Sequence, residues 1–476
     1  MDENNIDVVK TDEGAKDGQV KCPKCGATDI ALNTKTGKLR CNFCRHEFDP
    51  VKVDISPDIQ NLEGIRIGSG ASQIQADTKD VVTLKCSSCG AEVVIDTASA
   101  TQARCHWCRN TLSINQQVPN GAVPDVVLPF KMNKNEARSK IEGFVLKRKF
   151  FAHPTFTKEF TTENICGVYF PYMLVDVNAH MKLEGLGEIQ TRRYTVKSGD
   201  HEETLYDADS YQVGRDFDIA IDDLSIEASA DKLDYSSKDK TTNIINAIMT
   251  FDTENCVRYD SNYIKGYTSE KRDTDIKDLK EITETQAADV ARHSIKNSIS
   301  KYDRGVSWKS EDFNIKGESW TASYLPVWLY SYLEKKNGKN LLHYVAVNAR
   351  NGQTMGSVPI NKTKLIITSF IVEIVAFFLA LLLNPVFDDD KPYNWILLVA
   401  GFLFYFIMYS RYRNAGASYS YESKTKFTVS NLKTMDVFVE KKKRLRNARI
   451  KDENSSEVRG KHFKFNKPDI KIPGMK

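Results

Sequence analysis

Two long apolar runs dominate the hydropathy pattern near the C-terminal end of the chain. The first covers residues 365–383 and the second covers 393–410, which is 19 and 18 residues. A helix rises about 1.5 Å per residue, so the first run extends about 28 Å, close to the ~30 Å hydrocarbon core of a bilayer. Only residues 384–392 connect the runs, and Pro385 and Pro392 lie in this connection. The pattern predicts two transmembrane helices that form an antiparallel hairpin.

The charges that flank these runs predict the orientation of the hairpin. Lys362 and Lys364 precede the first run, and Arg411 and Arg413 follow the second. The connection carries the three aspartates 388–390 against one lysine. Because Lys and Arg favour the cytoplasmic side of a membrane, we expect a two-pass protein with both termini in the cytoplasm and the connection outside.

An acidic residue, Glu373, lies near the middle of the first run. A carboxyl group at that depth costs a few kcal/mol unless it faces protein or a polar cavity. Small residues at helical spacing let two helices approach closely. A packing face, within the hairpin or in a homo-oligomer, is therefore predicted at Ser369, Glu373, Ala376 and Ala380. A proton or ion pathway along this face is the alternative, although two helices per chain offer little to line one.

The region before the hairpin, residues 116–360, mixes two patterns and predicts an α+β domain. Apolar residues recur at helical spacing over 135–151 and 278–302. Runs rich in β-branched and aromatic residues predict strands at 168–177, 193–196, 217–221, 322–333 and 341–346. The last of these runs leads into Asn351-Gly352, a pair typical of a tight turn.

Two strand-like segments of this region resemble each other. Residues 167–176 read GVYFPYMLVD and residues 322–331 read ASYLPVWLYS. Both contain Tyr-x-Pro-x-(Met/Trp)-Leu, and each follows a predicted helix. A duplicated helix–strand unit would explain the repeat, with proline at the start or edge of a strand where no ladder donor is lost. Chance similarity is the alternative.

Eight of the ten cysteines form two sets with the same spacing. Each set has two C-x2-C pairs separated by fifteen residues. This is the spacing of a zinc ribbon, in which four thiolates hold one Zn²⁺ tetrahedrally. The predicted ligands of two Zn²⁺ ions are Cys22, Cys25, Cys41 and Cys44 in the first ribbon, and Cys86, Cys89, Cys105 and Cys108 in the second.

A disulfide framework is the rival interpretation of these cysteines. The chain opens with MDENNIDVVK, which lacks the apolar segment of a secretory signal. We therefore expect reduced thiolates in the cytoplasm, in agreement with the predicted orientation of the hairpin. Since four thiolates close the coordination sphere, each zinc is expected to be structural and to stabilise a ribbon too small to bury a core of its own.

The surfaces of the ribbons leave two interpretations open. Arg104, Trp107 and Arg109 in the second ribbon combine cations with an aromatic ring, as proteins that bind single-stranded nucleic acid do. In the interpretation that we favour, Phe43 and Trp107 instead form the small apolar side of each ribbon, and the charges are only solvated.

Composition and charge narrow the possible classes of function. The 476 residues are 41% hydrophobic and 27% charged, which excludes a wholly disordered chain. The net charge of +4 hides an asymmetry, because residues 411–476 hold 18 Lys and Arg against 7 Asp and Glu. In this basic segment a helix capped by Ser430 is expected to run through 441–446, either against anionic lipid or in solvent. No phosphate-binding loop, H-E-x-x-H or G-x-S-x-G motif occurs, so we expect no enzyme.

A family resemblance rests on the segment from Cys89 to Phe130, CGAEVVIDTASATQARCHWCRNTLSINQQVPNGAVPDVVLPF, on GVYFPYMLVD and on the two apolar runs. Together they resemble the bacterial membrane-anchored proteins labelled TFIIB-type zinc ribbon-containing, over roughly residues 86–410. The resemblance implies a protein of the bacterial cytoplasmic membrane with eight zinc-binding cysteines and a central docking platform. Some members accompany SPFH-domain scaffolds or phage-shock-type envelope stress proteins, and none supplies catalytic residues to transfer.

These predictions combine into one multidomain chain: two small β zinc ribbons, an α+β domain with an internal duplication, and a transmembrane hairpin. The predicted boundaries are a disordered N-terminus at 1–17, ribbons at 18–50 and 81–115 around a linker at 51–80, the α+β domain at 116–360, transmembrane helices at 365–383 and 393–410 around an external turn at 384–392, and a basic tail at 411–476. The favoured function is a membrane adaptor that contacts lipids and recruits protein partners such as an SPFH-domain scaffold. A membrane-tethered nucleic-acid-binding protein is the alternative.

Overall fold

The computed structural model describes residues 58–72, residues 22–49 and 124–450 with gaps, and short strands between 81 and 118. The longest gaps after residue 124 are 230–247, 384–398 and 414–419. The helices are α1 (Ser69–Ser72), α2 (Lys134–Leu146), α3 (Pro154–Glu159), α4 (Ile276–Ser294), α5 (Lys362–Leu383), α7 (Ala400–Arg413) and α8 (Tyr421–Lys424). Short 3-10 helices are η1 (Ile59–Asn61), η3 (Lys149–Phe151), η6 (Thr253–Asn255) and η8 (Lys296–Ile299).

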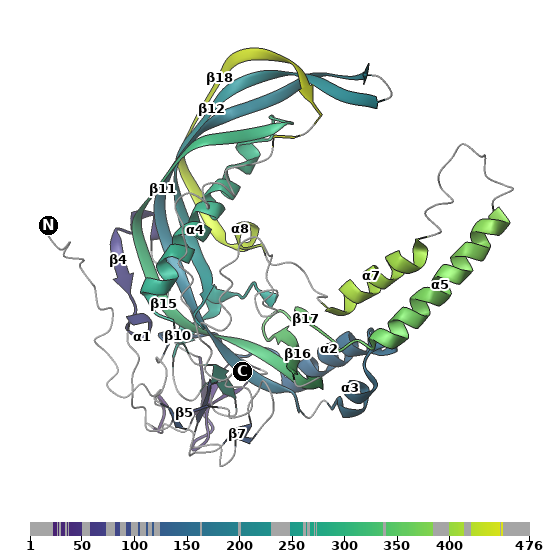
Figure 1. Ribbon diagram of the computed structural model, residues 1–476. Helices are drawn as coiled ribbons and strands as arrows, with labels where there is room; N and C mark the ends of the chain where they lie inside the picture. Colours follow the sequence, from purple (N-terminus) through teal and green to yellow (C-terminus); the bar gives the residue numbers. More distant parts are fainter. Residues whose placement is uncertain are drawn as a thin grey trace.

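Four unusually long strands form the body of the protein (Figure 1). They are β11 (Cys166–Ser198), β12 (His201–Glu227), β15 (Gly305–Lys336) and β18 (Lys426–Arg446). Neighbours pair antiparallel in the order β15–β11–β12–β18, and β16 (Lys339–Asn348) pairs with the C-terminal part of β15. The sheet curves into a half-barrel, and α4 packs against β11 and β12 (Figure 1). The predicted helices and strands of this region are confirmed, but runs predicted as separate strands belong to a few continuous ones.

The side chains of β11 explain why this sequence forms a sheet with one covered face. Val177, Met181 and Leu183 are fully buried, whereas Lys182 between them is exposed. Residues two positions apart in a strand point to the same face, so the buried set lies on one side. It belongs to the same apolar cluster as Leu279 of α4, which is also fully buried. This apolar cluster therefore lies between the curved sheet and α4, and a separate cluster packs α2 against β15 and β16.

The short strands extend this sheet or form sheets of their own. They are β1 (Ile30–Asn33), β2 (Lys38–Cys41), β3 (Glu47–Phe48), β4 (Gly64–Ile67), β5 (Val81–Lys85), β6 (Glu92–Asp96), β7 (Ala103–Arg104), β8 (Thr111–Leu112), β9 (Gln117–Val118), β10 (Val126–Val127), β13 (Val257–Arg258), β14 (Thr268–Glu270) and β17 (Thr354–Gly356). β4 pairs in parallel with β15, while β6 pairs with β14. The segment predicted as a linker, 51–80, and the segment predicted as the second ribbon, 81–115, therefore each contribute a strand to the central sheet, which satisfies backbone groups there.

The two similar segments lie side by side in the sheet. Tyr169 of β11 pairs with Pro326 of β15, and two residues further on Pro171 pairs with Tyr324. β14 pairs in parallel with β11 at Tyr169, and β10 pairs in parallel with β15 at Tyr324. The chain therefore contains two strand–helix–strand units, β10–α2–β11 and β14–α4–β15. The first strand of each unit pairs with the last strand of the other, which relates the two units by an approximate two-fold axis. This symmetry supports the predicted duplication.

The basic segment after the hairpin is a strand, so the helix predicted there is wrong. β18 pairs with β12 over its whole length, from Asp222↔Lys426 to Leu205↔Arg446, with three register shifts. Lys, Arg and Leu are good helix formers, but helix propensity amounts to only a fraction of a kcal/mol per residue. Pairing with a long neighbouring strand satisfies the backbone of the entire segment. Tertiary pairing therefore overrides the local preference.

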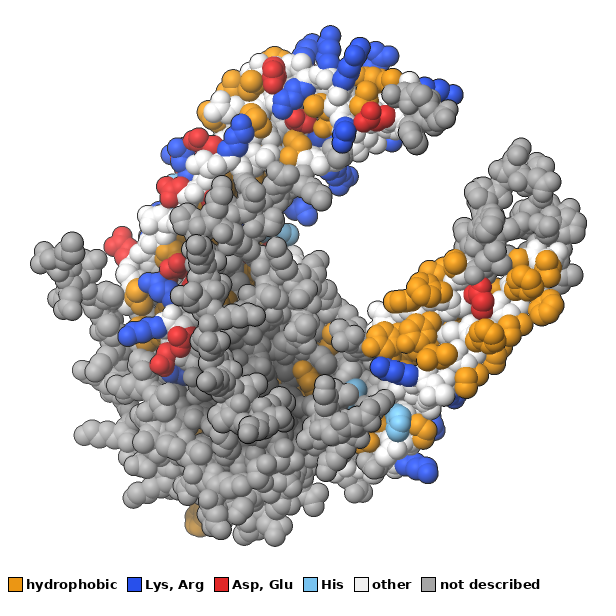
Figure 2. All heavy atoms as spheres, in the orientation of Figure 1, with side chains coloured by type: hydrophobic (Ala, Val, Ile, Leu, Met, Phe, Trp, Pro, Cys, Tyr) orange, Lys and Arg blue, Asp and Glu red, His pale blue; other side chains and the backbone are white. Residues whose placement is uncertain are grey.

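α5 and α7 project from the body as a pair (Figure 1). Among the described residues, α5 is the one helix that is long and apolar enough to cross a membrane, over Lys362–Leu381. Only 17% of its most apolar window is buried. Apolar side chains cover the visible surface of both helices (Figure 2). The predicted turn 384–392 and the start of the second predicted span lie outside the described residues.

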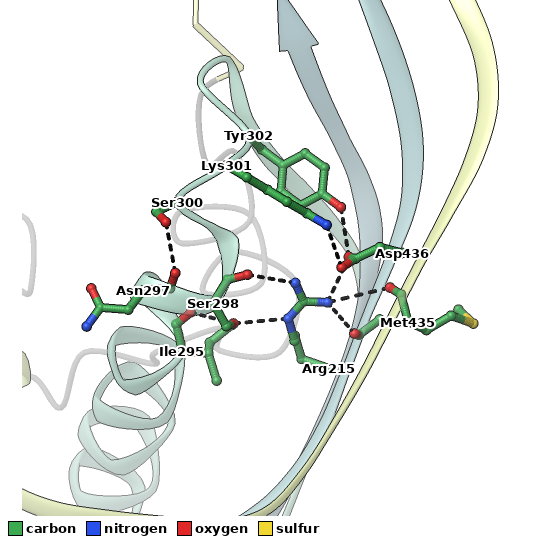
Figure 3. A network of polar contacts seen from close by, with 10 residues as sticks. Arg215, Ile295, Asn297, Ser298, Ser300, Lys301, Tyr302, Met435 and Asp436 are labelled. Carbon is green, nitrogen blue, oxygen red and sulfur yellow. Dashed lines mark hydrogen bonds and ion pairs between the residues drawn. The ribbon is translucent and has the colours of Figure 1, made fainter.

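One buried arginine joins β12 to β18 and to the segment that follows α4 (Figure 3). Arg215 donates from Nε to the Ser298 hydroxyl at 3.0 Å and from Nη2 to the Ser298 carbonyl at 2.9 Å. Its Nη1 donates to Oδ1 of Asp436 at 2.9 Å. Partial burial alone would raise the pKa of Asp436, but donors from Lys301, Tyr302 and Arg215 lower it to about 2. The carboxylate thus stays ionised and holds β18 against the end of the helical layer.

Replacing Arg215 by alanine is expected to destabilise the protein by about 3–5 kcal/mol, because it removes one partner of a buried ion pair. Thermal unfolding of the detergent-solubilised chain measures the loss, and hydrogen exchange in β18 should become faster. Lys433→Ala is the control: its Nζ is 3.9 Å from Asp216 and its side chain is 79% exposed, so the change should be ~0–1 kcal/mol. Unchanged exchange in β18 of Arg215→Ala would contradict this role of the arginine.

Candidate metal centre

The first cysteine set converges on one point. The sulfur atoms of Cys22, Cys25, Cys41 and Cys44 all lie within 4.8 Å of one another. The Cys22 and Cys44 sulfurs are 3.5 Å apart, and those of Cys25 and Cys41 are 3.6 Å apart. A disulfide measures about 2.05 Å, whereas sulfurs about 2.3 Å from a tetrahedral Zn²⁺ lie about 3.8 Å from each other. The four residues are free thiols whose arrangement fits one zinc ion.

Tight turns present both cysteine pairs of this set. Cys41 is the last residue of β2, and its sulfur accepts the amide of Cys44 at 3.4 Å. The amide of Arg45 donates to the Cys41 carbonyl at 2.9 Å, and Arg45 has a left-handed φ of 60° that closes the turn. In the first pair, the amide of Cys22 donates to the Ala27 carbonyl at 2.8 Å. Backbone hydrogen bonds thus fix the sulfurs before any ion binds.

The four thiols cannot all ionise without a cation. Burial alone would raise the pKa of Cys22, but amides of Cys25 and Lys24 and nearby thiols lower it to about 7. The Ala27 amide alone would lower the pKa of Cys25, but burial and the neighbouring sulfurs raise it to about 12. Repulsion between thiolates disappears when a divalent cation lies between them, so metal binding must release protons and must weaken as the pH falls.

The second cysteine set lies outside the described residues: Cys86, Cys89, Cys105 and Cys108. Strands on either side of its second pair are described, and there Arg104 of β7 pairs with Thr111 of β8. In the first set, Arg40 of β2 pairs with Glu47 of β3. In both places the residue before a cysteine pairs with the residue six positions after that cysteine. The shared register is what a second ribbon requires.

Phe43 does not occupy the position expected from the sequence. It lies in the turn between Cys41 and Cys44 and is 82% exposed, so it does not form the apolar side of the ribbon. Ile30 of β1, which pairs with Cys41, and Leu39 of β2, which pairs with Leu32, form that side, because both are buried. The side chains predicted to contact nucleic acid lie outside the described residues: Arg104, Trp107 and Arg109.

The predicted packing face of α5 lies toward α7. Ser369 and Ala376 are buried, and Ala380 is half-buried. Oε2 of Glu373 accepts the amide of Gly401, in the first turn of α7, at 2.6 Å. A Cβ atom on Gly401 would lie 2.4 Å from the Ser369 carbonyl, so the two helices touch through their backbones. The carboxylate therefore accepts one of the free amides at the start of α7, which explains an acidic residue in an apolar run.

An acidic cluster that was not predicted from the sequence lies on the curved sheet. One carboxyl oxygen each of Asp176, Asp222 and Asp223 lies within 4.8 Å of the others. The Asp223 amide donates to Oδ1 of Asp176 at 3.0 Å, and Asp223 has a left-handed φ of 52°. The pKa of Asp223 is raised to about 6, mainly by desolvation of its carboxylate. In the sequence, only the adjacent aspartates 222 and 223 could have indicated this cluster. Their closeness to Asp176 depends on the pairing of β11 with β12.

Comparisons with family models, with curated proteins and with solved structures found no match. The geometry of the chain itself therefore carries the functional argument. It offers a four-thiolate set fit for zinc and an apolar helix that is exposed along most of its length.

Cys25→Ser combined with Cys41→Ser is expected to remove one zinc equivalent per chain, because two thiolates cannot close a tetrahedral site. Elemental analysis of the purified full-length protein measures this directly. Cys166→Ser combined with Cys256→Ser is the matched control and should leave the zinc content unchanged, since neither sulfur belongs to the set. Equal zinc in wild type and the first variant would show that these cysteines hold no metal.

Asp223→Asn is expected to stabilise the protein at pH 7 by about 1–3 kcal/mol, because the wild-type carboxylate is ionised at a half-buried position where desolvation opposes its charge. A carboxyl whose pKa rises on folding binds more protons in the folded state. Wild-type stability contributed by this residue should therefore increase as the pH falls from 7 through about 6. Thermal unfolding between pH 5 and pH 7 measures it, and a pH trend that survives in Asp223→Asn would assign the effect elsewhere.

Proposed function

We propose that the protein is a non-enzymatic membrane adaptor. In this proposal a hairpin anchors the chain in the bacterial cytoplasmic membrane, and zinc ribbons and a β-rich docking domain face the cytoplasm. One observation carries the proposal: α5 exposes large apolar side chains along its length, with only 17% of its apolar window buried. Exposing apolar surface to water costs roughly 25 cal/mol of free energy per Å². The same surface in contact with the acyl chains of a bilayer avoids this cost.

The packing of α5 and α7 supports a two-pass topology. Gly401 and Ser369 bring the two backbones into contact, and the second apolar run of the sequence, 393–410, is long enough to cross a bilayer. The basic ends of both helices meet at the body, where Lys364 donates to the Phe150 carbonyl at 2.7 Å and Arg148 donates to the Arg411 carbonyl at 3.3 Å. The positive-inside rule then puts the body and both termini in the cytoplasm.

The base of the hairpin is fastened to the docking domain. The hydroxyl of Tyr412, at the end of α7, accepts the amide of Phe151 at 3.1 Å. The carbonyl of Tyr412 accepts the amide of Val358 at 3.3 Å. Tyr412 itself is 3% exposed. These contacts would hold the curved sheet at a fixed position relative to the membrane, as an adaptor requires.

Structural zinc fits this role better than catalysis. Four thiolates fill the coordination sphere of each ion and leave no position for a reacting water. Two zinc ions per chain, one in each set, would fold ribbons that serve as recognition surfaces. The resemblance noted from the sequence suggests SPFH-domain scaffolds or envelope stress proteins as the partners, and oligomers of the chain would increase the avidity for them.

A second candidate function is supported by the exposed ring of Phe43. It lies beside Arg45, and Arg40 precedes the same turn; both arginines are exposed. An exposed aromatic ring among cations can stack on a base and contact phosphates. This arrangement suits a membrane-tethered nucleic-acid-binding protein, in which the affinity falls steeply with salt.

Affinity capture of the full chain from detergent extracts, after cross-linking in native membranes, distinguishes the two functions. The adaptor should recover a protein partner in stoichiometric amounts at high salt and after nuclease treatment, because apolar and shape contacts resist screening. Cys25→Ser with Cys41→Ser should lose that partner while staying in the membrane fraction, which separates the ribbon from the anchor.

The control variant is Phe43→Ala with Arg45→Ala, which leaves the cysteines intact. Loss of a nuclease-sensitive, low-salt ligand in this variant, with no stoichiometric protein partner in the wild type, would favour the nucleic-acid function. A wild-type chain that fractionates as a soluble protein would contradict both proposals.

A further inference from the structure

Two large apolar side chains are exposed on the body next to the hairpin. Leu146 ends α2, Phe150 lies in η3, and each is 63% exposed. The residues around them are well packed: Phe144, Val145 and Phe151 are buried in the core. Leu and Phe side chains that are 63% exposed are unusual in a segment whose neighbouring side chains are buried. Something outside the described residues is expected to cover them.

The position of this segment indicates what covers it. Nζ of Lys364, in the first turn of α5, lies 3.9 Å above the ring of Phe150 and donates to its carbonyl. The amide of Asn361, just before α5, donates to the Phe151 carbonyl at 2.8 Å. Phe151 also contacts Phe404 of α7 edge to face, with ring centroids 6.2 Å apart. The exposed side chains thus lie where the hairpin would enter the bilayer.

The charge of this region complements an anionic membrane surface. Exposed cations surround the two apolar side chains: Lys147, Lys149, Lys362, Lys364 and Arg411. Residues 146–151 contain no acidic residue, and Glu142, one turn earlier in α2, is paired with Arg138 at 3.1 Å. Blue Lys and Arg side chains gather where the apolar hairpin meets the body (Figure 2). Lysines beside exposed Leu and Phe are typical of segments that lie in the headgroup region.

We propose that residues 146–151, here called the interface collar, bind the anionic lipid surface around the hairpin. Leu146 and Phe150 enter the upper acyl-chain region, and Lys147 and Lys149 contact phosphate headgroups. The collar adds a peripheral lipid site to the membrane anchor, and it rests on the proposed function because it requires that α5 spans the bilayer. It would fix the tilt and depth of the hairpin, since the collar is fastened to both helices.

Tryptophan quenching by brominated lipids tests the collar in the full-length chain reconstituted into vesicles. Phe150→Trp reports on the collar, Phe370→Trp on the exposed face of α5, and Val196→Trp on an exposed apolar position at the far end of β11. We expect the added emission of Phe150→Trp to fall by roughly half or more, with bromines near the headgroups more effective than deep ones. Phe370→Trp should be quenched best by deep bromines, and Val196→Trp should not respond.

Each other outcome has a definite meaning. If Phe370→Trp is quenched and Phe150→Trp is not, the collar is wrong and the membrane anchor stands. If neither is quenched, the anchor fails and the collar fails with it. If Phe150→Trp is shielded from bromolipid and also from an aqueous quencher, a protein or a second copy of the chain covers the segment, which overturns the lipid assignment. Quenching of Val196→Trp to the same degree would also overturn it, because the contact would not be confined to the collar.

The charge component has its own test. Lys147→Gln combined with Lys149→Gln should lower the ratio of phosphatidylglycerol to phosphatidylcholine retained per purified chain by roughly tenfold, because two cations leave the anionic surface. Lys197→Gln combined with Lys433→Gln is the matched control: both side chains are about 80% exposed on the curved sheet, and the ratio should not change. An equal fall in both double variants would show that net charge alone, and no local site, selects the lipid.

Discussion

Antiparallel pairing of β11 with β15 is the constraint on which the rest of the structure depends. It joins the two halves of the domain from Cys166↔Leu329 to Glu188↔Gly305. β12 and the short strand β14 pair with β11, while β16 and the short strand β10 pair with β15. β18 then pairs with β12. Contacts so distant in sequence cost loop-closure entropy before they stabilise anything. Two contributions offset that cost: the burial of apolar side chains between the sheet and α4, and hydrogen bonds between distant segments such as those of Arg215.

The sheet and the α5–α7 pair are joined by direct contacts. α5 begins beside η3, Tyr412 in the last turn of α7 contacts the same segment, and the chain then returns to the sheet as β18. The apolar pair therefore lies between two strands of the same domain and is not a detachable anchor. In the proposed function, the hairpin and the interface collar contact lipid and the ribbons contact a partner. Both contacts would then be made by parts of the chain that are joined to the same sheet.

Periodicity and spacing predicted the parts that depend on local chemistry. The C-x2-C pairs predicted a tetrathiolate set, because a metal site needs donors at short, fixed spacing. The first set converges as expected. Length and hydropathy predicted α5, and small residues around Glu373 predicted the face that contacts α7. The position of Phe43 was not predictable, because a ring in a turn has no periodicity that tells inside from outside.

The sequence by itself determined that the cysteines of the first set lie together, that α5 is a long apolar helix and that two strand segments repeat. Each of these depends on neighbours within a few turns of chain, or on a visible repetition. Only the tertiary structure decided that Lys426–Arg446 is a strand, that Asp176 approaches Asp223, and that Leu146 and Phe150 lie beside α5. Those outcomes depend on strand register and on packing between distant segments. A shift of one residue in the pairing of β11 with β12 would move Asp223 away from Asp176, and no local pattern specifies that register.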